Sequence, residues 1–362
     1  KVEEKGKKGR MDYTLLLIVV LLVVIGLVIL YSTSAYNGQV KFHDSFYYLK
    51  KQAFATVLGI VLMLFVAGMD YHIWQRLAVF GYLAAVALSV AVMLFGREIN
   101  GSKRWLALGP FSFQPSEFAK VALILFLADL VTKNVKTIGK MWTLCRIMFW
   151  ILPIVGLVGA SNLSTAIIIL GIGVILIFVA SPKYAQFALM GIAGACFMGI
   201  FLALESYRLE RLAIWRNPEK YEKGYQTLQG LYAIGSGGVF GVGIGNSVQK
   251  LGFVPEAQND MIFSIICEEL GLAGAGIIVF LFLLLIWRFF LIASGSRDLF
   301  GALIATGAMA HMMIQVILNI AVVTNTIPNT GITLPFISYG GTSVMFLLIE
   351  MGLVLSVSQV VD

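Results

Sequence analysis

The sequence predicts an all-α integral membrane protein with about ten transmembrane helices and a large extracytoplasmic loop between the seventh and eighth helices. Of its 362 residues, 59% are hydrophobic and only 12% are charged, whereas a soluble domain has about 25% charged residues. The apolar residues form runs close to the ~20 residues that cross a hydrocarbon core of ~30 Å. They do not show the short alternating pattern of a membrane β-barrel, so the spans are predicted to be helices.

The predicted spans follow the apolar runs in chain order. The first begins after a basic segment, but it is too long for a secretion signal and lacks an obvious small-residue cleavage site, so it is predicted to be retained. The ten spans are predicted at residues 11–33, 50–68, 73–95, 115–131, 143–160, 163–181, 184–203, 261–290, 299–322 and 339–361. Because ten is an even number, both termini are predicted to lie on one side of the membrane.

Basic residues predict which side that is. Lysines before residue 11, together with Lys133, Lys136 and Lys140 between the fourth and fifth spans, place it in the cytoplasm by the positive-inside rule. The chain is therefore predicted to consist of a cytoplasmic tail, residues 1–10, and a single ten-helix membrane domain, residues 11–362. The loop 204–260 of that domain then faces outward.

This outward loop is unusually basic. Long loops are not bound by the positive-inside rule, which is one explanation. The other is that clustered cations attract an anionic substrate such as a phosphate. The basic residues concerned are Arg208, Arg211, Arg216, Lys220, Lys223 and Lys250.

Cysteines and histidines indicate neither disulfides nor a protein-built metal site. Cys145, Cys196 and Cys267 are odd in number and fall in or beside apolar runs, so they are predicted to be packing residues. The three histidines are scattered singly, and no Cys/His pair has the spacing of zinc ligands.

The first motif that could carry chemistry combines Lys103, Arg104 and Trp105 with the segment from Gln114 to Lys120. Pro115 suits a first helical turn, so the fourth span is predicted to begin near Gln114. Glu117 and Lys120 are three residues apart and share one face of this helix. They could form a structural ion pair between helices, or Lys120 could contact a diphosphate together with Lys103 and Arg104.

The second motif runs from Phe253 to Asp260, directly before the eighth span. Asp260 could be the N-cap of that helix, since aspartate at a helix start satisfies backbone N–H groups. A carboxylate held beside a basic cavity could also serve as a general base. Glu256 is the competing candidate for this role.

The third motif, Thr330 to Ser343, opens the tenth span and contains Ser338, Gly340 and Gly341. Glycines beside hydroxyl groups at a helix start allow backbone donors to approach an anion, although helix packing would also explain them. Between Gly235 and Gly245 lies another glycine-rich segment, which matches neither nucleotide-binding pattern. It is predicted to be a flexible or membrane-dipping loop.

These motifs, their order and the ten-span plan resemble the shape, elongation, division and sporulation (SEDS) family over nearly the whole chain. The matching segments are Gln114 to Lys120, Pro255-Glu256-x-x-x-Asp260 with Glu268-Glu269-Leu270-Gly271, and Leu334-Pro335-x-x-Ser338-Tyr339-Gly340-Gly341. Val322-Val323-Thr324 and Ile332-Thr333-Leu334-Pro335 are more similar to the division member, FtsW, than to the elongation member, RodA, or a sporulation relative.

The resemblance implies a peptidoglycan glycosyltransferase that polymerises lipid II, an undecaprenyl-diphosphate-linked disaccharide pentapeptide, at the outer face of the bacterial cytoplasmic membrane during division or shape maintenance. It implies a class B penicillin-binding protein transpeptidase as partner, with other divisome or elongasome membrane proteins, and no nucleic acid. No cofactor is expected within the chain, although a divalent cation, Mg²⁺ or Mn²⁺, could accompany the lipid diphosphate.

By this resemblance Asp260 is the catalytic residue. It would take the proton of the acceptor's N-acetylglucosamine 4-hydroxyl, which attacks the donor's N-acetylmuramic acid and displaces undecaprenyl diphosphate. Lys103, Arg104 and Lys120 would stabilise the charge that develops on this leaving group. The remaining expected substrate-binding residues are Trp105, Glu117, Glu256, Ser338, Gly340 and Gly341.

Two departures from the family pattern stand out. Many members have Gln-Pro-Asp-x-Gly-Thr-Ala where this chain has Ser161 to Ala166, and some division-type members have a basic residue where it has Ser112-Phe113. Two other functions are consistent with the sequence, a lipid II flippase and a non-catalytic scaffold that recruits division proteins. Transport predicts polar groups spread to the bilayer midplane, whereas the motifs here gather at helix ends.

Overall fold

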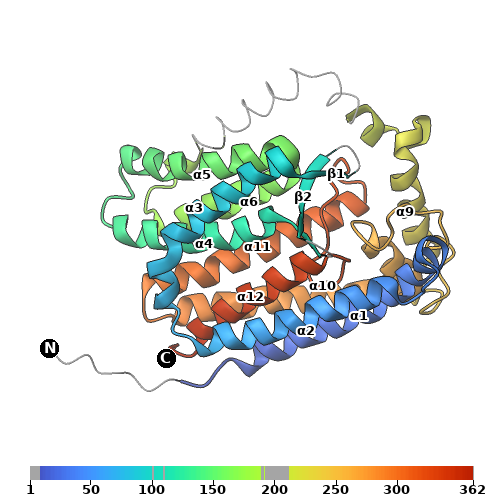
Figure 1. Cartoon of the computed structure of the whole chain (residues 1–362), viewed down its shortest axis with the longest axis horizontal. Coiled ribbons are helices and arrows are strands. Elements are labelled where there is room, and N and C mark those ends of the chain that lie inside the picture. The colour runs from blue at the N-terminus through green and yellow to red at the C-terminus, as the bar shows by residue number, and fades with distance from the viewer. Residues whose placement is uncertain (1–8, 100–101, 109–110, 189–190, 192–211, 362) are drawn as a thin grey trace.

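The computed structural model describes residues 9–99, 102–108, 111–188, 191 and 212–361. Within these residues, long helices run side by side along the long axis of the molecule (Figure 1). They are α1 (Tyr13–Phe42), α2 (Tyr47–Gly68), α3 (His72–Phe95), α4 (Pro115–Asn134), α5 (Met141–Ser161), α6 (Leu163–Ala180), α10 (Ile262–Gly295), α11 (Leu299–Val323) and α12 (Gly341–Ser358).

The first and last described parts of the chain meet at one end of the bundle. The Gly9 amide donates to the Gln359 carbonyl at 2.6 Å, and Figure 1 shows α1 beginning and α12 ending on the same side. We call this the terminal end and the opposite side the loop end. The placement of both termini together agrees with an even number of spans.

Apolar length confirms the predicted fold class of helical membrane protein. Eight of the long helices are long and apolar enough to cross a bilayer. The seventh predicted span, 184–203, lies mostly outside the described residues, so the count of ten stays a prediction. Several helices are longer than predicted, and in particular α1 continues to Phe42 and α10 to Gly295.

Helix α4 is the long helix that does not meet the apolar criterion. It contains four ionisable residues, Glu117, Lys120, Asp129 and Lys133. Three of these side chains are buried, and Asp129 pairs with Lys133 at 2.6 Å. Since α4 packs against α3, α6, α11 and α12, protein partners rather than lipid surround its polar groups.

The connection after α3 forms a small antiparallel sheet that the sequence did not predict. Strands β1 (Arg97–Ile99), β2 (Ser102–Leu108) and β3 (Phe111–Phe113) pair in the order β1-β2-β3 at the loop end (Figure 1). Leu106 faces Phe113 across the second pair. This sheet delivers the chain to Gln114, the N-cap position of α4.

The described part of the long loop also has structure at the loop end. Two short 3₁₀ turns, η1 (Pro218–Lys220) and η2 (Glu222–Gly224), precede helix α9 (Tyr225–Ser236). Helix α9 packs against α10. It therefore brings Gln226 close to the residues that precede α10.

Candidate active site

The three sequence motifs meet at the loop end. The Tyr339 amide donates to the Gln258 carbonyl at 2.9 Å, which joins the third motif to the second. The Thr342 hydroxyl donates to the Ser112 carbonyl at 2.8 Å, which joins the third motif to the strand before α4. Segments more than two hundred residues apart in sequence therefore form one site.

Asp260 lies in the turn before α10, and its side chain is almost fully buried. Gln226 Nε2 approaches its Oδ1 at 3.4 Å. The Asn319 carboxamide donates to the Asp260 carbonyl at 2.9 Å and to the Ile332 carbonyl at 2.7 Å. On the other side a Cβ on Gly331 would lie 3.9 Å from Oδ2. Gln226 and Gly331 thus lie beside the carboxylate, and Asn319 holds the backbone of Asp260.

The N-cap interpretation of Asp260 is wrong. The N-cap position of α10 is Met261, and no side chain caps this helix start. Burial instead determines the acidity of this carboxyl group and is the main reason that its pKa rises to about 6. Backbone N–H groups and Gln226 act in the opposite direction, while the negative charge of Glu256 raises the pKa further.

Glu256, the competing candidate base, has a different environment. Its backbone adopts φ 52°, in the left-handed region that non-glycine residues seldom occupy. Asn259 bonds to it twice, through its side-chain amide to the carboxylate and through its backbone amide to the carbonyl at 2.8 Å. Glu256 is thus held by its own turn and acts on Asp260 through charge.

Lys120 lies inside the bundle, 2% exposed. Its ammonium pairs with Glu117 Oε1 at 3.1 Å and donates to Gln315 Oε1 at 3.2 Å. Ser343 also bonds to Glu117. This arrangement is that of a buried ion pair linking α4 to α11 and α12, which favours the structural alternative for these two residues.

Two further polar side chains extend this pair deeper into the bundle. His311 Nε2 lies 2.9 Å from Gln315 Oε1, and its Nδ1 lies 2.8 Å from Glu350 Oε2. Gln315 Nε2 donates to the Thr333 carbonyl at 3.1 Å, so its Oε1 must be the acceptor. His311 Nε2 is therefore the donor to Gln315, while its Nδ1 faces the Glu350 carboxyl group. We call Glu117, Lys120, Gln315, His311 and Glu350 the interior polar chain.

The sequence did not predict the interior polar chain beyond its first pair. Glu350 and His311 lie within the predicted ninth and tenth spans, where an ionisable residue is itself a signal. The same holds for Asn319 and Gln52, which hold the site from α11 and α2. The usable signal was a polar side chain inside an apolar run.

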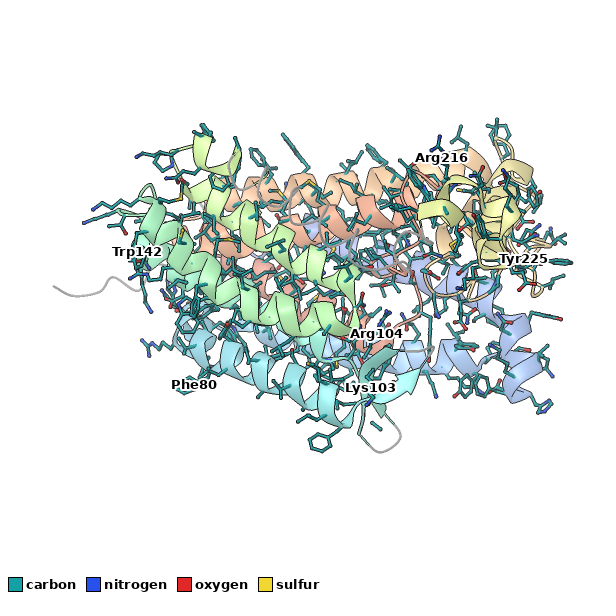
Figure 2. All side chains as sticks on the ribbon, turned by 90° about the horizontal axis from the view of Figure 1, so that it is seen from above. Phe80, Lys103, Arg104, Trp142, Arg216 and Tyr225 are labelled. Carbon is teal, nitrogen blue, oxygen red and sulfur yellow. The ribbon has the colours of Figure 1, made fainter. Side chains whose placement is uncertain are left out.

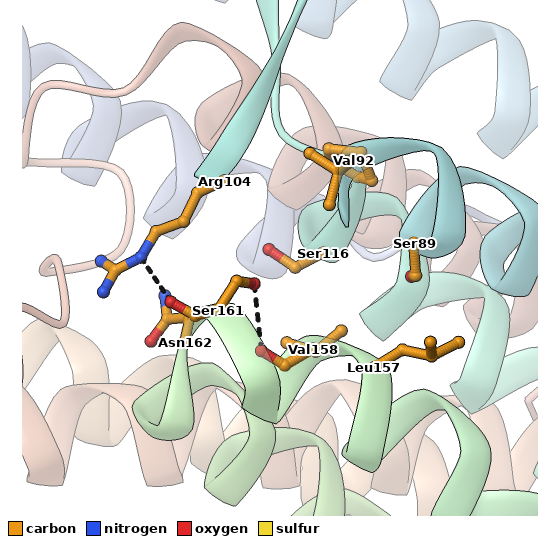
Figure 3. A pocket seen from close by; sticks show the side chains of 9 residues that line it. Ser89, Val92, Arg104, Ser116, Leu157, Val158, Ser161 and Asn162 are labelled. Atoms are coloured by element: carbon orange, nitrogen blue, oxygen red, sulfur yellow. Dashed lines mark hydrogen bonds between the residues drawn. The ribbon is translucent and has the colours of Figure 1, made fainter. Parts of the chain in front are cut away.

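Lys103, Arg104 and Trp105 lie on β2. Lys103 is exposed, and Figure 2 shows it beside Arg104 and apart from Arg216 and Tyr225 at the far loop end. Arg104 Nε donates to the Ser161 carbonyl at 3.0 Å over a small pocket at the start of α6 (Figure 3). β2 thus carries two adjacent cations at the loop end.

The segment Ser161 to Ala166, which departs from the SEDS pattern, forms the turn between α5 and α6. Asn162 Oδ1 accepts from the Thr165 amide at 3.2 Å and so caps α6. Ser164 donates to the Thr330 carbonyl at 2.8 Å. This turn therefore supports both Arg104 and the third motif without an acidic side chain.

In the third motif, Ser338 and Gly340 form hydrogen bonds that hold the backbone of the motif in place. The Ser338 hydroxyl accepts from the Leu334 amide at 2.8 Å. Gln52 bridges the motif, since its Nε2 donates to the Ser338 carbonyl at 3.2 Å and its Oε1 accepts from the Gly340 amide at 3.0 Å. Gly341 is the first residue of α12, where a Cβ would lie 3.2 Å from the Ala55 side chain.

The basic residues of the long loop differ in their surroundings. Lys250 does not face outward, because it is buried and bonds to Glu269 Oε1 at 2.6 Å and to the Ser32 hydroxyl at 3.0 Å. Arg216, Lys220 and Lys223 are exposed. Arg208 and Arg211 lie outside the described residues. Attraction of an anion can therefore involve only part of the predicted set.

A metal site built from the protein needs several ligating side chains close together. In the part of the chain that the structure describes, no group of three His, Cys, Asp or Glu side chains is placed to hold a metal ion. A divalent cation that accompanies a lipid diphosphate would belong to the substrate.

The chain is similar to known proteins in family, sequence and structure. The family model of FtsW, RodA and SpoVE, described as cell cycle protein, matches residues 13–362. Stage V sporulation protein E of Bacillus subtilis is 40% identical, covering 98% of both chains. The probable peptidoglycan glycosyltransferase FtsW of Trichlorobacter lovleyi is 35% identical, covering 96% of this chain and 93% of that protein.

Solved structures share the same fold. A chain from a peptidoglycan synthase complex, described as coordinating polymerization and crosslinking, superposes with a TM-score of 0.82 at 30% identity, covering 96% of this chain and 97% of that one. The rod shape determining protein RodA of Thermus thermophilus superposes with a TM-score of 0.71 at 28% identity, with 96% of both chains covered.

Proposed function

Because the chain belongs to the FtsW, RodA and SpoVE family of cell cycle proteins, we propose that it is a peptidoglycan glycosyltransferase that polymerises lipid II at its loop end. Relatives that are 34–35% identical have this activity in their names. In this proposal the chain lies in the bacterial cytoplasmic membrane, with the terminal end in the cytoplasm and the loop end outside.

One observation carries the mechanism: Asp260 is a buried carboxylate whose pKa is raised to about 6 at the point where the three motifs meet. A base with this pKa is mostly ionised at neutral pH and is more basic than an ordinary aspartate. The donors that act on this carboxylate, the Gln226 amide and backbone N–H groups, are all neutral. The groups that set the pKa of Asp260 therefore include no cation that would lower its basicity.

The reaction is written as a displacement with inversion. Asp260 takes the proton of the acceptor's 4-hydroxyl as that oxygen bonds to the anomeric carbon of the donor sugar. The bond from this carbon to the diphosphate oxygen breaks, and undecaprenyl diphosphate leaves with the electron pair. Asp260 then returns its proton to water, and the site is ready for the next addition.

Charge on the leaving group requires cations that are already in place. We assign this role to Lys103, which is exposed on β2, and to Arg104 beside it. Lys120 is assigned to the interior polar chain, where Glu117 neutralises it. Trp105 extends from the same strand and is proposed to pack against the sugar or lipid.

The proposed partner is a class B penicillin-binding protein transpeptidase that crosslinks the new strand. The superposition on a chain of a peptidoglycan synthase complex supports this choice. The chain is then the polymerising half of a two-protein machine.

A lipid II flippase is the second candidate, and one observation favours it. The interior polar chain extends from Glu117 in the first turn of α4 to Glu350, nine residues into α12. Polar groups at such depth are typical of transport pathways. They are closed here, because both ends and His311 between them are buried.

Reconstitution in liposomes distinguishes the two functions. Purified protein with its partner transpeptidase is supplied with lipid II, and glycan strands are separated by electrophoresis while labelled lipid II is followed across the bilayer. Strands are expected from the native chain and from Glu222→Ala, an exposed acid of the loop end, but not from Asp260→Ala. Strands from Asp260→Ala would refute the general-base role, and lipid transfer without any strands would favour the flippase.

A further inference from the structure

The segment from Gly237 to Gly245, which we call the glycine loop, takes no part in the proposed catalytic mechanism. The loop is not flexible, because it pairs with α10 like a short ladder. The Val242 and Gly243 amides donate to the Glu268 and Glu269 carbonyls, each at 2.9 Å. In return the Leu272 and Ala273 amides donate to the Gly238 and Val239 carbonyls at 3.0 and 2.9 Å.

This pairing is possible because α10 is broken at Gly271. That residue has φ 67° and ψ −169°, which interrupts the helical hydrogen bonds and frees backbone groups on both sides. Only glycine allows the close approach that follows. A Cβ on Gly241 would lie 2.2 Å from the Glu269 carbonyl oxygen, and one on Gly237 would lie 1.9 Å from that of Cys267.

The side chains of the glycine loop face away from the protein. Phe240 is 83% exposed, Val239 58% and Ile244 57%, and Leu272 beside them on α10 is 71% exposed. No residue between Gly237 and Gly245 is polar. A contiguous apolar surface of this kind marks contact with a protein or a membrane.

Two helices locate this surface relative to the bilayer. Arg288 of α10 pairs with Asp12, the N-cap of α1, and such a charged pair marks the membrane boundary at the terminal end. About 20 residues, or ~30 Å of helix, cross the hydrocarbon core. Counting ~20 residues from Arg288 along α10 reaches Glu268, and the same count from Asp12 along α1 reaches Ser32.

Both counts reach the same place. The Ser32 hydroxyl bonds to Glu269 at 2.8 Å, so α1 and α10 arrive together at the opposite membrane boundary. This is the level at which the glycine loop pairs with α10. Its continuation along α10 is apolar and exposed at Phe280, Leu283 and Trp287, so the loop extends an exposed apolar face of a helix long and apolar enough to cross a membrane.

We propose that the glycine loop is a membrane-contact element, in which Val239, Phe240 and Ile244 insert among the lipid headgroups and upper acyl chains at the loop end. Irregular backbone enters this region only when its polar groups are paired, and the ladder with α10 pairs two amides and two carbonyls of the loop. The occupant of the surface is lipid. Since α10 begins two residues after Asp260, the inserted loop also sets the height of that residue above the bilayer.

The test measures the depth of a nitroxide label in vesicles of phosphatidylethanolamine and phosphatidylglycerol. Labels are attached to Phe240→Cys and, separately, Ile244→Cys, in a chain whose three native cysteines are replaced by alanine and whose unfolding temperature matches the native chain. Glu222→Cys is the aqueous control and Leu283→Cys the lipid control, since both side chains are exposed in the structure. Collision rates with oxygen and with a water-soluble nickel chelate are compared.

The expected oxygen-to-nickel ratio at both loop positions is several-fold above that of the Glu222 control and close to that of Leu283. A ratio at either position equal to the Glu222 control would overturn the proposal. A second result would also overturn it: the nickel chelate reaches the label in the chain alone but no longer reaches it after a class B transpeptidase is added. The surface would then be a protein interface.

Discussion

Asp260 and Lys120 are both ionisable, both buried and both near the loop end, but only the charge of Lys120 is balanced by an opposite charge. Lys120 is neutralised by Glu117 and continues into a chain of polar side chains. The groups that set the pKa of Asp260 include no cation, and burial raises this pKa to about 6. A compensated charge holds helices together, whereas an uncompensated carboxylate costs stability and gains basicity.

The largest effect is expected from Asp260→Asn, which keeps the shape of the side chain and removes the uncompensated carboxylate that serves as the base. The rate of strand formation from lipid II is expected to fall by about 10²- to 10⁴-fold, the usual contribution of general-base catalysis. Initial rates in liposomes measure it, with Glu222→Gln as an exposed acid that should leave the rate unchanged. A normal rate from Asp260→Asn would show that the base lies elsewhere.

The second substitution tests the compensated charge of Lys120. Lys120→Met leaves the Glu117 carboxylate buried without its cation and is expected to lower the free energy of unfolding by about 3–5 kcal/mol. The double variant with Glu117→Gln should recover most of this loss. Thermal unfolding of the single and double variants in detergent measures the coupling. Losses that simply add would mean that the two side chains do not act as a pair.

Stability against pH sharpens the contrast further. Burial raises the pKa of Asp260 from 3.8 to about 6, so the unfolded chain ionises this residue more easily than the folded one. The folded state therefore loses stability as the pH rises from about 4 to about 6, by on the order of 2–3 kcal/mol. Asp260→Asn lacks this cost.

It follows that Asp260→Asn should unfold at a higher temperature than the native chain near pH 7 and at an equal temperature near pH 4. Differential scanning measurements at both pH values provide the check. Equal stability at both would mean that ionised Asp260 is compensated by a partner.

The smallest expected effect comes from Glu256→Gln. The Glu256 charge raises the pKa of Asp260, so its removal should move the midpoint of the pH–rate curve downward by a fraction of a pH unit. Glu219→Gln, an exposed acid of the same loop, serves as the control and should not move it. An upward shift would contradict the sign of this charge effect.

Much of the fold could be predicted because apolar length is a local property. The predicted runs other than 184–203, which lies mostly outside the described residues, became helices, and Asp260 lies directly before α10 as expected. The end of α1 was predicted too early, since Ser32 and Thr33 interrupt the apolar run. Both are buried in the helix, where Ser32 bonds to Glu269 and Thr33 to the Ile29 carbonyl.

The unpredicted features depend on contacts between distant segments. Lys120 meets Gln315 across 195 residues, and Arg104 meets the carbonyl that ends α5. The break at Gly271 follows from the glycine loop that fits against it, and neither segment alone indicates the pairing. Local pattern indicated the candidate site residues, but long-range contacts decide which of their charges are compensated.

The pH dependence of lipid II polymerisation by the native chain tests most directly whether burial makes Asp260 the base. The initial rate should be constant near neutral pH and fall as the pH drops through about 6, because protonation removes the base form. A rate that stays constant down to about pH 4, the ordinary range of an exposed aspartate, would contradict the assignment.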